Sequence, residues 1–266
     1  MDHLPANIRG DYLNLAGDPR YRHFVHIPDR IIRCIDYFGI PCDRTAARTR
    51  LLAYYLFIGV VDDAIDSGSI DAGGSILEYL NNRVPVFDAT ARCSSVKLVT
   101  EILKCNIDDA TYPLMMDKLK ELYFECVVER GATSIDSYID HRESVGSLTA
   151  ELSYLLIRST LSGDHEKLSQ FMQQVGAIGC LVDSLIDLSA DCRLGLLGFR
   201  PGFPDYAKLT ITILRDGLRM SVNHLGLSGL FLIAIVDNVL DSFRAAQDRP
   251  QPCFVSDRKD KAASVA

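Results

Sequence analysis

Apolar positions recur with a helical period along most of the chain, and alternating patterns typical of strands are sparse. The pattern predicts helices separated by short turns that contain Gly, Pro or Asp. The expected helices cover residues 29–39, 44–67, 75–82, 94–103, 112–130, 135–162, 166–191, 206–224 and 230–247. We therefore expect an all-α protein built as a helical bundle.

The segment Leu51–Val61 is apolar around most of the helical circumference, which is typical of a helix in the middle of a bundle. No run of Gly, Ser or Pro divides the chain, so we expect a single domain over residues 1–245. Residues 246–266 carry several basic side chains without apolar periodicity, which predicts a flexible C-terminal tail.

Composition narrows the choice of partners. A formal net charge of −7 and a pI near 5.4 argue against nucleic acid. The eight cysteines form no CxxC pair, so reduced thiols and a cytoplasmic location are expected. No transmembrane segment is expected, because the late apolar stretch Leu225–Val236 is too short to span a bilayer. The oligomeric state stays open, with a homodimer as one option.

Three carboxylates end the central apolar run, in Asp62-Asp63-Ala64-Ile65-Asp66. On a helix, Asp62 and Asp66 share a face one turn apart, with Asp63 beside them. Like charges at this spacing repel by about 0.2–0.5 kcal/mol on an exposed helix, unless a cation lies between them. Mg²⁺ suits such oxygen ligands and takes its remaining ligands from water and phosphates. A solvated helix end is the alternative for this motif taken alone.

A second acidic stripe follows a later apolar stretch, with Asp183, Asp187 and Asp191 spaced four residues apart. Asp is a poor residue for a helix interior, so a merely solvated stripe would more naturally use Glu and Lys. Two such stripes that face each other across a cavity would hold several Mg²⁺ ions and grip a diphosphate. Asp237 and Asp241 form a rival pair, interpreted as a solvated helix end because no third carboxylate extends it.

Together these motifs resemble those of class I isoprenoid synthases, the family that includes terpene cyclases and squalene/phytoene synthases. The segment Asp62–Asp66 matches the first motif, DDxxD, and the later aspartates fall on the three ligand positions of the second. Asp183 follows Asp62 by 121 residues, an interval that suits both subfamilies. The resemblance implies the class I terpenoid synthase fold, a helical bundle around a central apolar cavity, with about three Mg²⁺ ions per site.

Further segments extend this resemblance. Arg142 and Gly146 have the spacing of a cyclase element in which an arginine senses diphosphate and a glycine breaks the helix. Arg193 lies in a segment similar to the Asp-x-Arg-x-Gly of phytoene-type enzymes, and implies a second contact to substrate. Ile186 departs from the phytoene-type pattern, which has arginine there. For Arg142, an ion pair with Glu143 or Asp140 at a wet surface is the alternative.

Aromatic side chains near the motifs are candidates for stabilising a carbocation by cation–π attraction. Tyr55 is best placed, about two turns before the first motif, and Phe57 and Phe171 are candidates for contact with the substrate. Taken singly, each of these rings is more simply a core residue.

The resemblance implies a terpene synthase, a carbon–oxygen lyase that ionises a C15 or C20 prenyl diphosphate with Mg²⁺ and cyclises the resulting cation. Two alternatives stay open. One is head-to-head condensation of two substrates, as in squalene/phytoene synthases, and the other is a non-catalytic relative that acts as a partner subunit.

Overall fold

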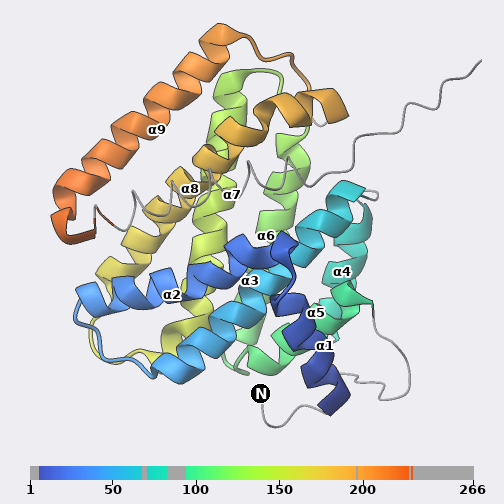
Figure 1. Ribbon diagram of the computed structural model, residues 1–266, viewed down its shortest axis with the longest axis vertical. Coiled ribbons are helices and arrows are strands. Elements are labelled where there is room, and N and C mark those ends of the chain that lie inside the picture. Colours follow the sequence, from blue (N-terminus) through green and yellow to red (C-terminus); the bar gives the residue numbers. More distant parts are fainter. Residues whose placement is uncertain (1–5, 68–70, 83–93, 196, 228, 230–266) are drawn as a thin grey trace, which may run out of the picture.

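The computed structural model describes residues 6–67, 71–82, 94–195, 197–227 and 229 (Figure 1). These residues form nine α-helices and three short 3-10 turns, with no strand beyond one isolated bridge between Cys42 and Leu161. The α-helices are α1 (Ala6–Ala16), α2 (Arg22–Tyr37), α3 (Arg44–Ser67), α4 (Asp71–Asn81), α5 (Ser95–Asn106), α6 (Tyr112–Glu129), α7 (Ile135–Ile157), α8 (Glu166–Leu194) and α9 (Phe203–Asn223). The 3-10 turns are η1 (Pro19–Tyr21), η2 (Arg158–Thr160) and η3 (Leu225–Leu227). The predicted all-α class is confirmed.

Most predicted helices match the observed ones to within a few residues, and the bounds of α3 coincide with the prediction. The N-terminal region differs. The helix α1 was not predicted, because it buries only a narrow face through Ile8, Tyr12 and Leu15. The helix α2 begins at Arg22 rather than at residue 29, with Pro28 inside it. The predicted helix 230–247 and the predicted tail lie outside the described residues.

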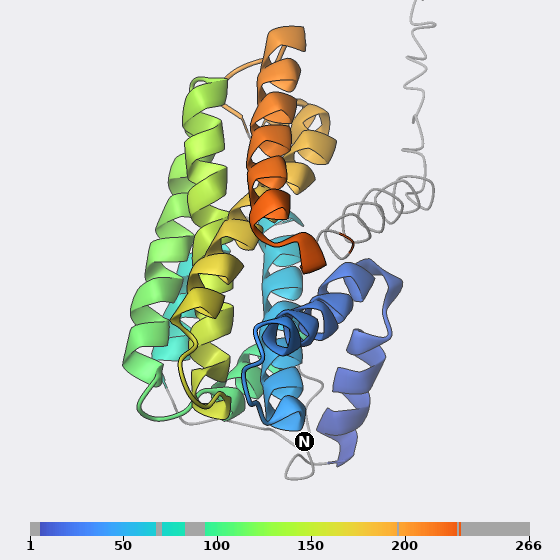
Figure 2. The same cartoon turned by 90° about the vertical axis from the view of Figure 1, so that its left-hand side faces the viewer.

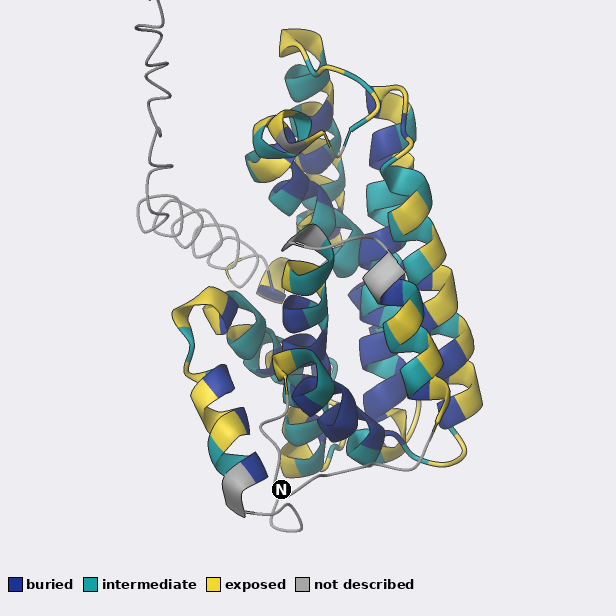
Figure 3. Ribbon diagram, turned by 90° about the vertical axis from the view of Figure 1, so that its right-hand side faces the viewer, coloured by how far each residue is buried: buried dark blue, intermediate teal, exposed yellow. Residues whose placement is uncertain are grey.

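The helix α3 lies in the middle of the bundle, as its apolar circumference predicts (Figure 1). It packs against α2, α5 and α7, and its central side chains, such as Leu51, Tyr54 and Leu56, are fully buried. Buried residues concentrate between the helices, whereas the outer faces of the peripheral helices are exposed (Figure 3). None of the described helices has both the length and the apolar character needed to cross a membrane.

The helices α7 and α8 run side by side and touch backbone to backbone (Figure 2). A Cβ placed on Gly146 would lie 2.2 Å from the carbonyl oxygen of Gly176, and one placed on Gly176 would lie 2.3 Å from that of Gly146. Such distances exclude any side chain at either position without separation of the helices. The crossing therefore sets how closely α8 and its acidic stripe approach the rest of the bundle.

Candidate functional site

The first acidic motif lies near the C-terminal end of α3, where Asp62 and Asp63 are exposed. The carboxylate of Asp63 accepts a hydrogen bond from the Tyr21 hydroxyl at 3.1 Å, and Nη1 of Arg20 lies 3.5 Å from the same oxygen. Both partners come from the turn η1, and neither was foreseen from the sequence. The side chain of Asp66 lies outside the described residues.

The second acidic motif occupies the last three turns of α8, where Asp187 is exposed and Asp183 and Asp191 are half-buried. A continuous helix through all three residues preserves the predicted common face. The helix ends at Gly195, whose φ of 72° lies in the left-handed region that glycine adopts without strain.

One carboxylate of each motif influences the same thiol, that of Cys180 on α8, which is half-buried. Burial raises the pKa of Cys180 to about 12, Arg142 opposes this rise, and the negative charges of Asp183, Glu129 and Asp62 add to it. The same Asp62 contributes to the raised pKa of Cys126. One carboxylate from each motif thus influences the same cysteine, and the face-to-face arrangement of the two motifs stays a prediction.

Arg142 lies between α6 and α8 and is held by three kinds of acceptor. Its Nε donates to the Ser184 hydroxyl at 2.7 Å, its Nη1 to Glu129 at 3.3 Å, and its Nη2 to the Cys180 carbonyl at 3.4 Å. The alternative of a surface pair with Glu143 or Asp140 is therefore wrong. Arg142 instead links α7 to Glu129 on α6 and to the segment of α8 that carries Cys180 and Ser184.

Glu129, at the end of α6, was missed by sequence reasoning because it is thirteen residues from its partner Arg142 along the chain. Its side chain is 13% exposed, and burial raises the pKa of its carboxyl group, although the charge of Arg142 opposes that rise. The pair thus places one positive and one negative charge in a partly desolvated position next to Cys180 and Ser184 of α8.

The resemblance implied that Gly146 breaks its helix, and this expectation is wrong for the described structure. The helix α7 runs without a break from Ile135 to Ile157. Gly146 instead serves the close crossing with Gly176 on α8. Its carbonyl oxygen therefore stays within regular helical backbone.

The aromatic candidates Tyr55, Phe57 and Phe171 pack as core residues, which was the alternative to a role in binding the substrate or its cation. Tyr55 is buried, its hydroxyl oxygen accepts a hydrogen bond from Ser153 at 2.9 Å, and burial raises its pKa to about 12. Phe57 is buried in the same cluster. Phe171 lies in a separate cluster, packed edge-on against Phe38 with ring centroids 5.3 Å apart. Arg193, the other substrate-binding candidate, is exposed in the last turn of α8.

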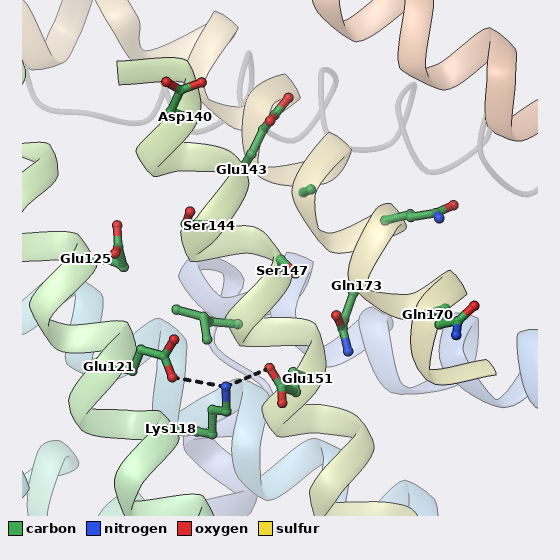
Figure 4. A pocket seen from close by; sticks show the side chains of 13 residues that line it. Lys118, Glu121, Glu125, Asp140, Glu143, Ser144, Ser147, Glu151, Gln170 and Gln173 are labelled. Atoms are coloured by element: carbon green, nitrogen blue, oxygen red, sulfur yellow. Dashed lines mark ion pairs between the residues drawn. The ribbon is translucent and has the colours of Figure 1, made fainter. Parts of the chain in front are cut away.

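A second acidic region is a groove of about 710 Å³ between α6, α7 and α8 (Figure 4). Its charged lining consists of Lys118, Glu121, Glu125, Asp140, Glu143 and Glu151. Lys118 is paired with Glu121 at 3.0 Å and with Glu151 at 3.2 Å. At 3.6 residues per turn, the α7 members of this lining, Asp140, Glu143 and Glu151, project from the side of α7 away from Arg142. This polar α6–α8 groove is not the apolar cavity that the resemblance implies.

The donor chemistry of the motifs suits Mg²⁺ held together with a substrate. Among the described residues, no three His, Cys, Asp or Glu side chains lie close enough together to hold a metal ion. Mg²⁺ commonly uses only one or two carboxylates and completes its octahedron with water and phosphate oxygens. Asp62 and Asp183 therefore fit Mg²⁺ that arrives with a diphosphate, rather than an ion enclosed by protein alone.

No family model matches the chain, and no curated protein or solved structure is significantly similar to it. The similarity of the two acidic motifs to those of isoprenoid synthases therefore stands as a hypothesis.

Proposed function

We propose that the protein is a Mg²⁺-dependent enzyme that ionises a prenyl diphosphate, with cyclisation of the resulting carbocation as its main reaction. The proposal is supported by the influence of both Asp62 and Asp183 on Cys180, whose carbonyl accepts a hydrogen bond from Arg142 of the Arg142–Glu129 pair. Carboxylates that converge from two helices, with a fixed guanidinium behind them, suit a metal-bridged diphosphate.

In this proposal the aspartates of α3 and α8 bind and orient the metal–diphosphate complex. Bound Mg²⁺ would neutralise the negative charge that develops on the departing diphosphate. Arg142 contributes a guanidinium that keeps its charge at any physiological pH and whose position is set by Ser184 and the Cys180 carbonyl. Since these groups are already oriented, they stabilise the developing charge without reorganisation. No protein nucleophile is required.

A head-to-head condensation of two prenyl diphosphates is the second candidate. The spacing of Arg142 and Gly146 and the presence of Ile186 favour cyclisation. The unbroken course of α7 through Gly146 favours condensation, because the helix break of the cyclase element is missing. Both candidates share the ionisation step and the same metal-binding aspartates.

Product analysis tests the proposal. The protein is incubated with Mg²⁺ and with C10, C15 or C20 diphosphates, and the hydrocarbon products and released diphosphate are measured. Cyclic products support the first candidate, whereas a linear C30 or C40 product selects the second. We expect Asp62→Asn and Asp187→Asn each to lower turnover by about 10²-fold or more, as loss of a charge-stabilising group does.

The matched control is Asp117→Asn, the same change at a side chain of α6 that is 77% exposed. We expect this variant to keep full turnover. Unchanged activity in Asp62→Asn or Asp187→Asn would rule out the assigned ligands. Absence of diphosphate release with every substrate would leave the non-catalytic relative as the better hypothesis.

A further inference from the structure

The turn η1 presents two donors to the first acidic motif from a fixed backbone. Pro19 occupies the first position of the turn, where its ring restricts φ. Asp18 caps the turn by accepting a hydrogen bond from the backbone N–H of Arg20 at 3.0 Å. The turn therefore holds Arg20 and Tyr21 in a defined position between α1 and α2.

The guanidinium of Arg20 is oriented by the same Asp18. Nε lies 3.2 Å from each carboxylate oxygen of Asp18, and Nη2 donates to Oδ2 at 2.8 Å. These bonds leave Nη1 facing Asp63, 3.5 Å from its Oδ2. The Tyr21 hydroxyl donates to that same Oδ2 at 3.1 Å, so a cation and a hydroxyl share one oxygen of Asp63.

The two donors differ in how firmly they are held. Tyr21 is buried, and the Arg20 guanidinium lies over its ring at 5.2 Å. The Arg20 and Asp63 side chains are 64% and 56% exposed. An ion pair with that exposure is weak, because water screens both charges. A divalent cation, with twice the charge and a preference for carboxylate oxygens, is able to displace it.

We propose that Arg20 and Tyr21 form a clamp on Asp63 that occupies its carboxylate until metal binds, so that metal binding at the first motif releases the turn η1. The inference rests on the proposed function, since it takes Asp63 to be a metal ligand. Without metal, Arg20 partly neutralises the charge of Asp63 and Tyr21 hydrogen-bonds to the same oxygen. With metal, Arg20 and the metal compete for one oxygen.

Calorimetric titration with Mg²⁺ in the presence of inorganic diphosphate tests the competition, because the proposed site takes Mg²⁺ together with diphosphate. We expect Arg20→Ala to tighten Mg²⁺ binding by about two- to five-fold, the range that a partly exposed ion pair allows. Tyr21→Phe removes one hydrogen bond without charge, so a smaller change in the same direction is expected. Arg22→Ala is the matched control, because it removes a positive charge two residues away, and its Mg²⁺ affinity should equal that of the wild type.

Limited trypsin digestion provides a second readout that is independent of activity. Trypsin cleaves after Arg20, and mass spectrometry separates this cut from the one after Arg22. We expect Mg²⁺ to accelerate cleavage after Arg20 in the wild-type protein. We expect Tyr21→Phe to be cleaved there faster than wild type even without Mg²⁺, with helix content by circular dichroism unchanged.

The possible results test the clamp and the proposed enzymatic function separately. If Mg²⁺ binds the wild type but Arg20→Ala and Arg22→Ala bind it equally well, the clamp is wrong and the metal site stands. Equal rates of cleavage after Arg20 with and without bound Mg²⁺ would also overturn it. If Mg²⁺ fails to bind and no diphosphate is released from any substrate, the proposed function and the clamp fall together.

Discussion

Two acidic regions lie on opposite sides of α7, and they differ in what surrounds their charges. The region between α3 and α8 contains Asp62 and Asp183 beside the partly buried pair of Arg142 and Glu129. The α6–α8 groove also contains several carboxylates, but Glu121 and Asp140 are exposed, and Lys118 is paired with both Glu121 and Glu151. The number of carboxylates in a cluster therefore says less about a site than desolvation and the position of counter-charges.

Exposure measures this difference directly. Glu129 is 13% exposed and burial raises its pKa, whereas Glu121 in the groove is 51% exposed. The Arg142–Glu129 pair therefore interacts through partly dry protein, where charges act strongly on one another. Exposed groove charges such as Glu121 interact mainly through water, which weakens them, although burial also raises the pKa of Glu143.

The largest expected effect concerns the crossing that separates the two regions. Gly146→Val places a side chain where the Gly176 carbonyl oxygen is 2.2 Å from the Cβ position, so α7 and α8 must move apart. We expect a loss of about 3 kcal/mol or more in the free energy of unfolding, measured in urea. Gly217→Val on α9 is the matched control, because nothing lies within 4 Å of its Cβ position. Equal losses in the two variants would contradict a tight crossing.

A smaller effect is expected from Glu129→Gln, measured as unfolding free energy against pH. Because burial raises the folded-state pKa of Glu129, its ionisation favours the unfolded chain. The wild type should therefore lose stability relative to Glu129→Gln as pH rises from below the ordinary carboxyl range through the raised pKa.

Asp108→Asn is a reference variant for which we expect the opposite dependence of stability on pH. A hydrogen bond from Arg50 lowers the pKa of Asp108, so its contribution to stability is present above the ordinary carboxyl range and is lost as pH falls. The stability difference between wild type and Glu129→Gln could instead change with pH in the same direction as the difference between wild type and Asp108→Asn. That result would show that Glu129 is solvated, and the contrast between the two acidic regions would disappear.

The smallest effect is expected in the groove. Lys118→Met removes the ion pairs with Glu121 and Glu151, for which we expect a loss of about 0.2–1 kcal/mol in unfolding free energy. The loss should shrink further at high salt, because salt screens exposed charges. A loss above about 2 kcal/mol at high salt would place the groove carboxylates in the same desolvated class as Glu129.

Much of the fold was predictable from local pattern. The uninterrupted apolar surface of residues 51–61 predicted both the bounds of α3 and its central place. The helix α1 was missed because its narrow buried face carries little periodic signal. The role of Gly146 was wrongly predicted. The sequence alone does not distinguish a glycine that breaks a helix from one that allows two helices to cross closely.

The sequence by itself determined that the protein is helical and that each acidic stripe shares one helix face, because both follow from the 3.6-residue period. Only the tertiary structure decided which charges meet. Glu129 joins Arg142, and Arg20 and Tyr21 reach Asp63 from forty-two or more residues away, through packing that no local pattern encodes. Burial of Glu129 and Tyr21 also depends on neighbouring helices, because contacts between distant segments exclude water from these side chains.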